Sequence, residues 1–178
     1  MTLELLLRVA RGAIAEALGL DPSPCPREPW LLHTGASFVT LTQGERLRGC
    51  VGSVRAHRPL VEDVRWNAVA AALRDPRFPP LASAELRSTR IEVSLLSPLE
   101  PMPWTSEAEA SAQVRPGLDG LVLEAGGRAG VFLPQVWDEI PEPRDFLRHL
   151  RRKAGLAEAD WLPGTRLLRF SVVKVRED

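Results

Sequence analysis

A cysteine set between two glycines is the residue best placed to do chemistry in this sequence: Cys50, in Leu47-Arg48-Gly49-Cys50-Val51-Gly52. Glycines in a strand allow another backbone or a ligand to approach closely. Arg48 lies two residues before Cys50, so both side chains point to the same face of a regular strand. A nearby guanidinium favours the thiolate, which is the nucleophilic form. The segment therefore fits a nucleophilic thiol, although from position alone the commoner fate of a free cysteine is burial as a small hydrophobe.

Two further segments carry groups that could assist such a thiol. Asp75-Pro76-Arg77-Phe78-Pro79-Pro80 is a rigid loop that displays one carboxylate and one guanidinium. Prolines hold such groups in place at little entropic cost, which suits recognition of an anion. A helix stop with a local ion pair explains the same residues. Glu92 lies opposite the apolar face of a predicted strand, where it either transfers protons in a groove or simply faces water.

The familiar signatures of cofactor and metal sites are missing from the sequence. His33, His57 and His149 have no ligand spacing with one another or with the cysteines, so no zinc site is predicted. There is no P-loop, dinucleotide fingerprint or serine-centred nucleophile elbow. We therefore expect no cofactor and no metal. The basic segment 144–153 could meet phosphates, but such a run is more often a solvated helix face.

The composition is that of an ordinary globular protein. The 178 residues are 44% apolar, and 23 basic side chains balance 23 acidic ones. A chain of this length buries enough surface to fold as one domain, residues 1–178, without a disulfide or a structural metal. Zero net charge argues against a protein that coats nucleic acid or an anionic membrane through its overall field, although a local basic patch could still bind nucleic acid.

The sequence predicts a cytoplasmic protein. Charges interrupt the apolar run at the start of the chain, unlike the core of a secretory signal. No stretch approaches the roughly 18 uninterrupted apolar residues of a membrane span. Without an export signal, Cys25 and Cys50 are expected to be reduced thiols.

The apolar periodicity predicts two halves that repeat the order hairpin, helix, strand, within residues 31–97 and 117–176. A helix over residues 2–18 precedes them and packs on the core. The other predicted elements are a hairpin over 38–54, a helix from Pro59 to Arg74, a strand over 90–96, a short helix over 107–113, a hairpin over 120–133, a helix over 143–154 and a strand over 167–175. Hairpins make antiparallel pairs, so the pattern favours an α+β fold whose halves share one sheet.

Six ordered motifs resemble those of the AMMECR family, whose prokaryotic members are called AmmeMemoRadiSam system protein A. The resemblance covers about Leu3 to Val175. The motifs are Phe38-Val39-Thr40-Leu41, Leu47-Arg48-Gly49-Cys50-Val51-Gly52, Asp75-Pro76-Arg77-Phe78, Ile91-Glu92-Val93-Ser94, Leu133-Pro134-Gln135-Val136 and Lys153-Ala154-Gly155-Leu156. Many relatives carry a second cysteine where this chain has Arg151 or Arg152, so the resemblance does not extend to a second thiol there.

For the fold, the resemblance implies a duplicated unit whose strands form one barrel-like, largely antiparallel sheet with flanking helices. For function, it implies association with a Memo-like protein and a radical SAM enzyme, and a site around the signature thiol. In the enzymatic interpretation, Cys50 is the nucleophile or covalent carrier, and Glu92 or Asp75 moves protons. Arg48 and Arg77 then hold an anionic or nucleotide-like substrate.

The alternative is a non-catalytic adaptor whose groove binds a partner protein or nucleic acid. Thiol reactivity separates the two interpretations, because an enzyme's Cys50 should react readily at neutral pH and an adaptor's buried thiol should be inert. The chain has no predicted means of redox or radical chemistry. Under the family's association, the partners must therefore supply that chemistry.

Overall fold

The strands form two sheets in the computed structural model, which describes residues 2–157 and 161–178. The chain divides into two compact units. Unit 1 contains the chain up to Leu96 together with Val173–Asp178, and unit 2 contains Ser97–Val172. None of the helices in these described ranges has the length and apolarity needed to cross a membrane.

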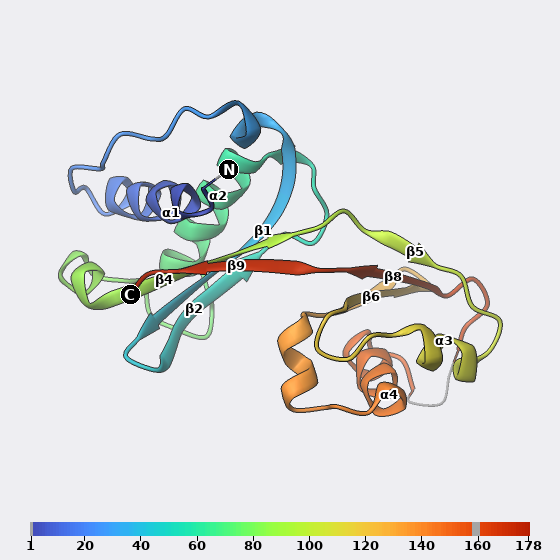
Figure 1. Cartoon of the computed structure of the whole chain (residues 1–178). Helices are drawn as coiled ribbons and strands as arrows, with labels where there is room; N and C mark the ends of the chain where they lie inside the picture. The colour runs from blue at the N-terminus through green and yellow to red at the C-terminus, as the bar shows by residue number, and fades with distance from the viewer. Residues whose placement is uncertain (1, 158–160) are drawn as a thin grey trace. The chain divides into compact units, whose positions relative to one another are not determined.

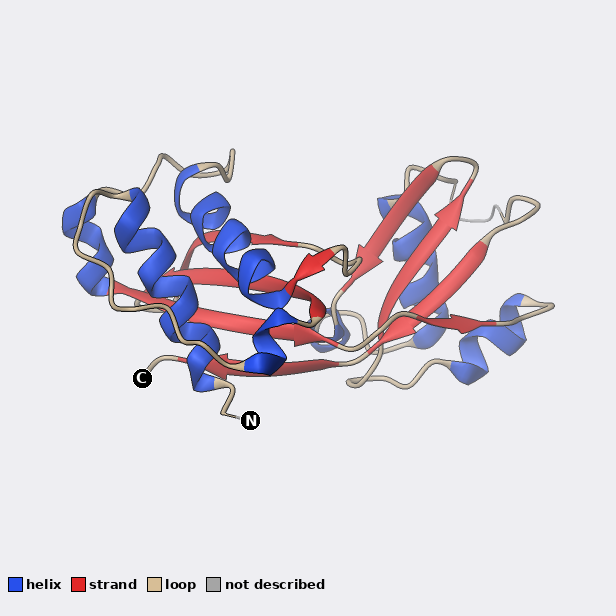
Figure 2. Cartoon of the chain, turned by 90° about the horizontal axis from the view of Figure 1, so that it is seen from above, coloured by secondary structure: helices blue, strands red, loops and turns tan. Residues whose placement is uncertain are grey.

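Unit 1 has a five-stranded sheet with its two α-helices on one face (Figures 1 and 2). The strand order is β2-β1-β4-β9, and the short β3 pairs with β1. β1 pairs antiparallel with each of its three neighbours. The elements are α1 (Glu4–Ala17), η1 (Pro29–Leu32), β1 (Thr34–Gln43), β2 (Arg46–Gly52), β3 (Arg58–Pro59), α2 (Leu60–Leu73), η2 (Ser83–Ser88), β4 (Thr89–Leu96) and β9 (Val172–Arg176).

The core of unit 1 follows from residue alternation in the strands. Val39 and Leu41 in β1, and Ile91 and Val93 in β4, are fully buried and pack in one apolar cluster with residues of α1 and α2. Successive strand residues point to opposite faces, so the residues between them lie on the face that carries no helix. The helices thus define which face of the sheet is open.

Unit 2 has a four-stranded sheet in the order β5-β8-β6-β7, with antiparallel pairing throughout the described residues. Its elements are β5 (Glu100–Met102), α3 (Glu107–Gln113), β6 (Gly120–Ala125), β7 (Arg128–Phe132), η3 (Pro134–Asp138), α4 (Pro143–Lys153) and β8 (Arg166–Phe170). The buried rings of Trp137 and Phe146 stack with centroids 3.7 Å apart. This unit has its own apolar cluster, to which α4 contributes Phe146, Leu147 and Leu150.

The two units place corresponding strands in the same order. In each, the first hairpin strand lies between the second hairpin strand and the strand that follows the helix, giving β2-β1-β4 and β7-β6-β8. Each hairpin also brings a glycine against a helix carbonyl: Gly49 of β2 faces the Ala71 oxygen, and Gly130 of β7 faces the Leu150 oxygen. The outermost strands are exchanged, because β5 follows β4 but pairs with β8, whereas β9 follows β8 but lies beside β4.

The antiparallel α+β architecture is confirmed, but the expectation of one barrel-like sheet is not. The hairpins at 38–54 and 120–133 belong to two different sheets, and no closed barrel is found in the described part of the chain. Each hairpin buries its apolar face against helices of its own unit, which leaves two apolar clusters. The predicted strand over 167–175 is likewise divided at Ser171 into β8 and β9, which join different sheets.

Candidate functional site

A polar row crosses the helix-free face of the unit 1 sheet. The strand register places Thr40 of β1 opposite Cys50 of β2 on one side and opposite Glu92 of β4 on the other. These three alternate with the buried residues that face the helices, so they share the open face. Lys174 of β9 extends the row, since its Nζ lies 3.6 Å from Glu92 Oε1.

Cys50 is a free, half-buried thiol held by polar neighbours. The Thr40 hydroxyl donates a hydrogen bond to its Sγ over 3.3 Å. Its backbone N–H donates to Asp75 Oδ2 over 2.9 Å. The surroundings therefore differ from the fully aliphatic pocket of a cysteine that serves only as a core hydrophobe.

Asp75 fixes the position of both Cys50 and Arg77. Besides the Cys50 N–H, its buried carboxylate accepts hydrogen bonds from Arg77 N, Nε and Nη2 over 3.1, 2.9 and 2.6 Å. The hydrogen bond from the Arg77 side chain is the main reason why the pKa of Asp75 lies well below its ordinary value. Asp75 is thus ionised throughout the neutral range. Its contacts indicate that it positions the Cys50 backbone and the Arg77 side chain.

Arg77 presents a cation next to Cys50. Its side chain is 54% exposed, and its Nη2 donates to the Cys50 carbonyl oxygen over 3.2 Å. Its pKa is raised, chiefly by the hydrogen bond to Asp75, and the charge of a Cys50 thiolate acts in the same direction. The guanidinium is therefore accessible, anchored, and close enough to Cys50 to meet an anionic group bound there.

Glu92 shares the face with Cys50 but lies two strands away. Neighbouring strands are about 4.8 Å apart, so the two side chains stand roughly 10 Å from each other. A direct hydrogen bond between the Glu92 carboxylate and Sγ is therefore excluded in this arrangement. Thr40 occupies the position between them, and a water or a bound molecule would have to complete any proton path.

Arg48 is turned into the protein. The register between β1 and β2 shifts at this point, so Arg48 has no opposite residue and the two-residue alternation does not hold. Its guanidinium donates to the Pro79 carbonyl over 2.8 Å, to the Pro80 carbonyl over 3.4 Å and to both oxygens of Glu85 over 3.2 Å. Arg48 thus ties β2 to the loop after Asp75, and the structure does not bring its cation to the Cys50 face.

Acid should weaken the interaction between Arg48 and Glu85. The pKa of Glu85 is lowered from 4.5 to about 2, mainly because its carboxylate accepts hydrogen bonds from the Arg48 side chain. A depressed native pKa gives stability that is complete above the unfolded value and is lost as pH falls through the native value. We expect Glu85→Gln to lower the urea midpoint near pH 7, and the difference from wild type to close towards about pH 2. Denaturation curves over this range would contradict the assignment if the difference stayed constant.

Thr40 and Lys174 belong to the row but were not singled out in the sequence. The hairpin register could have identified Thr40, because it alternates with Val39 and Leu41 and pairs with Cys50. Lys174 could not have been found in this way, since its neighbour Glu92 is 82 residues away in sequence and joins it only through the pairing of β4 with β9. Over residues 2–157 and 161–178, no three His, Cys, Asp or Glu side chains gather as metal ligands would.

Known proteins resemble the chain over nearly its whole length. The AMMECR1 family model matches residues 7–175. A protein of Methanothermobacter thermautotrophicus is 40% identical over 178 residues, with 97% of this chain and 93% of the relative covered. A protein of Aeropyrum pernix is 42% identical over 184 residues, with 98% and 78% covered. The crystal structure of the uncharacterised protein PH0010 from Pyrococcus horikoshii is 35% identical, has a TM-score of 0.87, and covers 98% of this chain and 91% of its own.

Proposed function

The chain belongs to the AMMECR1 family, and on that premise we propose that unit 1 handles an anionic substrate at Cys50. The observation that carries the proposal is the anchored, accessible Arg77 guanidinium beside a half-buried thiol. Asp75 holds both groups in place through the same carboxylate. An anion held by Arg77 would therefore sit within reach of the sulfur.

In the proposed reaction, Cys50 is the nucleophile and Glu92 the proton carrier. A water or the bound substrate carries the thiol proton to Glu92, and the sulfur forms a bond to an electrophilic carbon of the substrate. The bond between that carbon and the leaving group breaks, and the leaving group takes up the proton from Glu92. The step is a substitution that needs neither an oxidant nor a metal. The Glu92 carboxylate is held from the β9 side by Lys174, whose Nζ lies 3.6 Å from Oε1.

The wider setting is also a proposal. We assign the chain to the cytoplasm, together with a Memo-like protein and a radical SAM enzyme that supply redox and radical chemistry, as the family resemblance implies. The substrate would be a small anion or a nucleotide-like molecule. We further propose that the two units are repeats of one ancestral unit, and the shared strand order and the glycines Gly49 and Gly130 support this origin.

Alkylation with a charged and an uncharged reagent tests the anion-binding role of Arg77. The chain provides an internal reference, because Cys25 is an exposed free thiol. We expect the rate with iodoacetate, relative to iodoacetamide, to be about fivefold higher at Cys50 than at Cys25, which corresponds to roughly 1 kcal/mol of attraction between charges about 4 Å apart in water. Cys25→Ser and Cys50→Ser variants isolate each thiol, and mass spectrometry follows the products.

Two arginine variants separate charge from structure in this experiment. Arg77→Gln should remove the preference for iodoacetate, whereas Arg77→Lys, which keeps the charge, should retain most of it. Equal ratios at Cys50 and Cys25 would remove the basis of the proposal. An unreactive Cys50 in a protein whose Cys25 reacts would favour the non-catalytic adaptor.

A further inference from the structure

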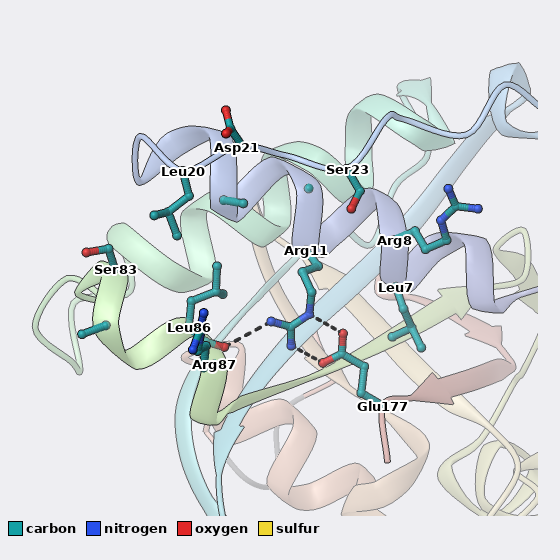
Figure 3. A pocket seen from close by; sticks show the side chains of 13 residues that line it. Leu7, Arg8, Arg11, Leu20, Asp21, Ser23, Ser83, Leu86, Arg87 and Glu177 are labelled. Atoms are coloured by element: carbon teal, nitrogen blue, oxygen red, sulfur yellow. Dashed lines mark hydrogen bonds and ion pairs between the residues drawn. The ribbon is translucent and has the colours of Figure 1, made fainter.

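A second candidate binding site lies beside α1 in unit 1 (Figure 3), and none of its lining residues belongs to the polar row of Cys50, Thr40, Glu92 and Lys174. It is a cavity of about 450 Å³ between α1, the segment that follows it, η2 and Glu177. This volume falls within the range of small-molecule sites, about 300–1,000 Å³. The lining residues that decide its chemistry are Leu7, Arg11, Gly12, Leu20, Leu86 and Arg87.

The inner wall of the cavity is apolar. Leu7 and Ala15 of α1 and Leu86 of η2 line it and are 8%, 8% and 7% exposed. Leu20, which is 40% exposed, reaches towards Leu86 from the segment after α1 (Figure 3). An apolar body bound here would cover Leu20 and complete the burial of the inner wall.

Gly12 leaves room for such a body. It lies inside α1, where glycine is less favourable than alanine. Neither backbone conformation nor crowding requires glycine at this position: its φ is not positive, and an added Cβ would meet only the Ser23 carbonyl oxygen at 3.4 Å, an ordinary contact. A larger side chain at position 12 would instead occupy the cavity that Gly12 lines.

The cavity also carries a positive charge that the protein does not neutralise. Arg11 is engaged, because it donates to both Glu177 oxygens and to the carbonyls of Leu86 and Thr89. For Arg87, by contrast, the described part of the chain offers no hydrogen bond or ion pair, and the Asp21 carboxylate points away from it (Figure 3). The guanidinium stands at the edge of the apolar wall, next to Leu86.

We propose that this cavity binds a small amphipathic anion. The apolar body of the ligand packs against Leu7, Leu20 and Leu86 over Gly12, and its carboxylate or phosphate pairs with Arg87. This cavity does not include Cys50. The alkylation experiment and the displacement of a probe from the cavity therefore test separate proposals.

Displacement of a fluorescent probe from the full-length protein tests the ligand class. The probe is 8-anilinonaphthalene-1-sulfonate, which has an aromatic body and an anionic group. Octanoate and octyl phosphate should displace it at concentrations at least about tenfold lower than octylamine, which has the same chain length but the opposite charge. Displacement by octylamine as effective as that by octanoate would overturn the proposal.

Variants then locate the site. Arg87→Gln should weaken octanoate binding about tenfold, whereas Arg90→Gln, a matched change at an exposed arginine outside the cavity, should leave it unchanged. Gly12→Leu should abolish probe binding without lowering the melting temperature. If Gly12→Leu fails to fold, Ala84→Trp decides, because Ala84 is an exposed lining residue on η2. A folded variant with a filled cavity and unchanged probe affinity would show that the probe binds elsewhere.

Discussion

Replacing Gly49 by alanine should destabilise the protein by about 3 kcal/mol, at the upper end of the cost of overpacking a core. An alanine Cβ at this position would lie 2.1 Å from the Ala71 carbonyl oxygen and 3.0 Å from its carbon. Both atoms are backbone atoms of α2, so no side-chain rotation can relieve the clash. Either β2 must leave the sheet edge or α2 must shift across the apolar core.

Urea denaturation followed by circular dichroism measures this effect, and two other glycines serve as references. Gly130→Ala should be destabilising but milder, because its Cβ would lie 2.8 Å from the Leu150 carbonyl oxygen. Gly12→Ala should be neutral or stabilising, since its nearest contact is at 3.4 Å and alanine favours helix. A Gly49→Ala protein as stable as wild type would mean that β2 is not held against α2.

The second large effect is expected for Asp75→Asn, which should lower the free energy of unfolding by about 2–3 kcal/mol near neutral pH. The amide cannot replace a carboxylate that accepts four hydrogen bonds from Cys50 and Arg77. The N–H of the half-buried Cys50 loses its charged acceptor, whereas the half-exposed Arg77 recovers part of its loss by hydration. The Cys50 backbone and the Arg77 cation would both lose their common anchor, so the preference of Cys50 for iodoacetate should fall as well.

The pH dependence of this effect identifies its electrostatic origin. Because the native pKa of Asp75 is depressed, its stabilising contribution is complete above the unfolded value of 3.8 and is lost as pH falls below it. The difference in the free energy of unfolding between wild type and Asp75→Asn should therefore become smaller in acid. Asp145→Asn is the matched control, since Asp145 forms an exposed ion pair with Arg148 and should change stability by less than about 0.5 kcal/mol. If this difference in stability does not change with pH, the effect of Asp75→Asn comes from a packing defect and not from the lost charge.

Local patterns in the sequence were sufficient for most elements. Alternation around Val39 and Leu41, and around Ile91 and Val93, predicted the strands and the face of Glu92 correctly. The short helix over 107–113 was predicted where α3 lies, and Ser106 caps it by accepting a hydrogen bond from the Glu109 N–H. In both cases the signal is contained within a few neighbouring residues.

The predictions that failed depend on long-range pairing. The sequence does not show that Ser171 separates strands of two sheets, because β8 and β9 are both short runs rich in apolar residues and the break depends on which strands they pair with. The shift in register at Arg48 is equally invisible from its own strand. For the candidate site, the motifs pointed to Cys50, Asp75 and Arg77, but the shared carboxylate that joins them is a contact across 25 residues.

The exchanged outer strands have a consequence for synthesis on the ribosome. β4 is complete by Leu96, but its neighbour β9 is translated only after all of unit 2. Until then the backbone groups along one edge of β4 lack their partner strand, and Arg11 lacks Glu177. An unpaired strand edge invites association with other chains. While unit 2 is being made, the nascent protein therefore exposes a strand edge that is prone to association, and pairing of β9 with β4 covers this edge.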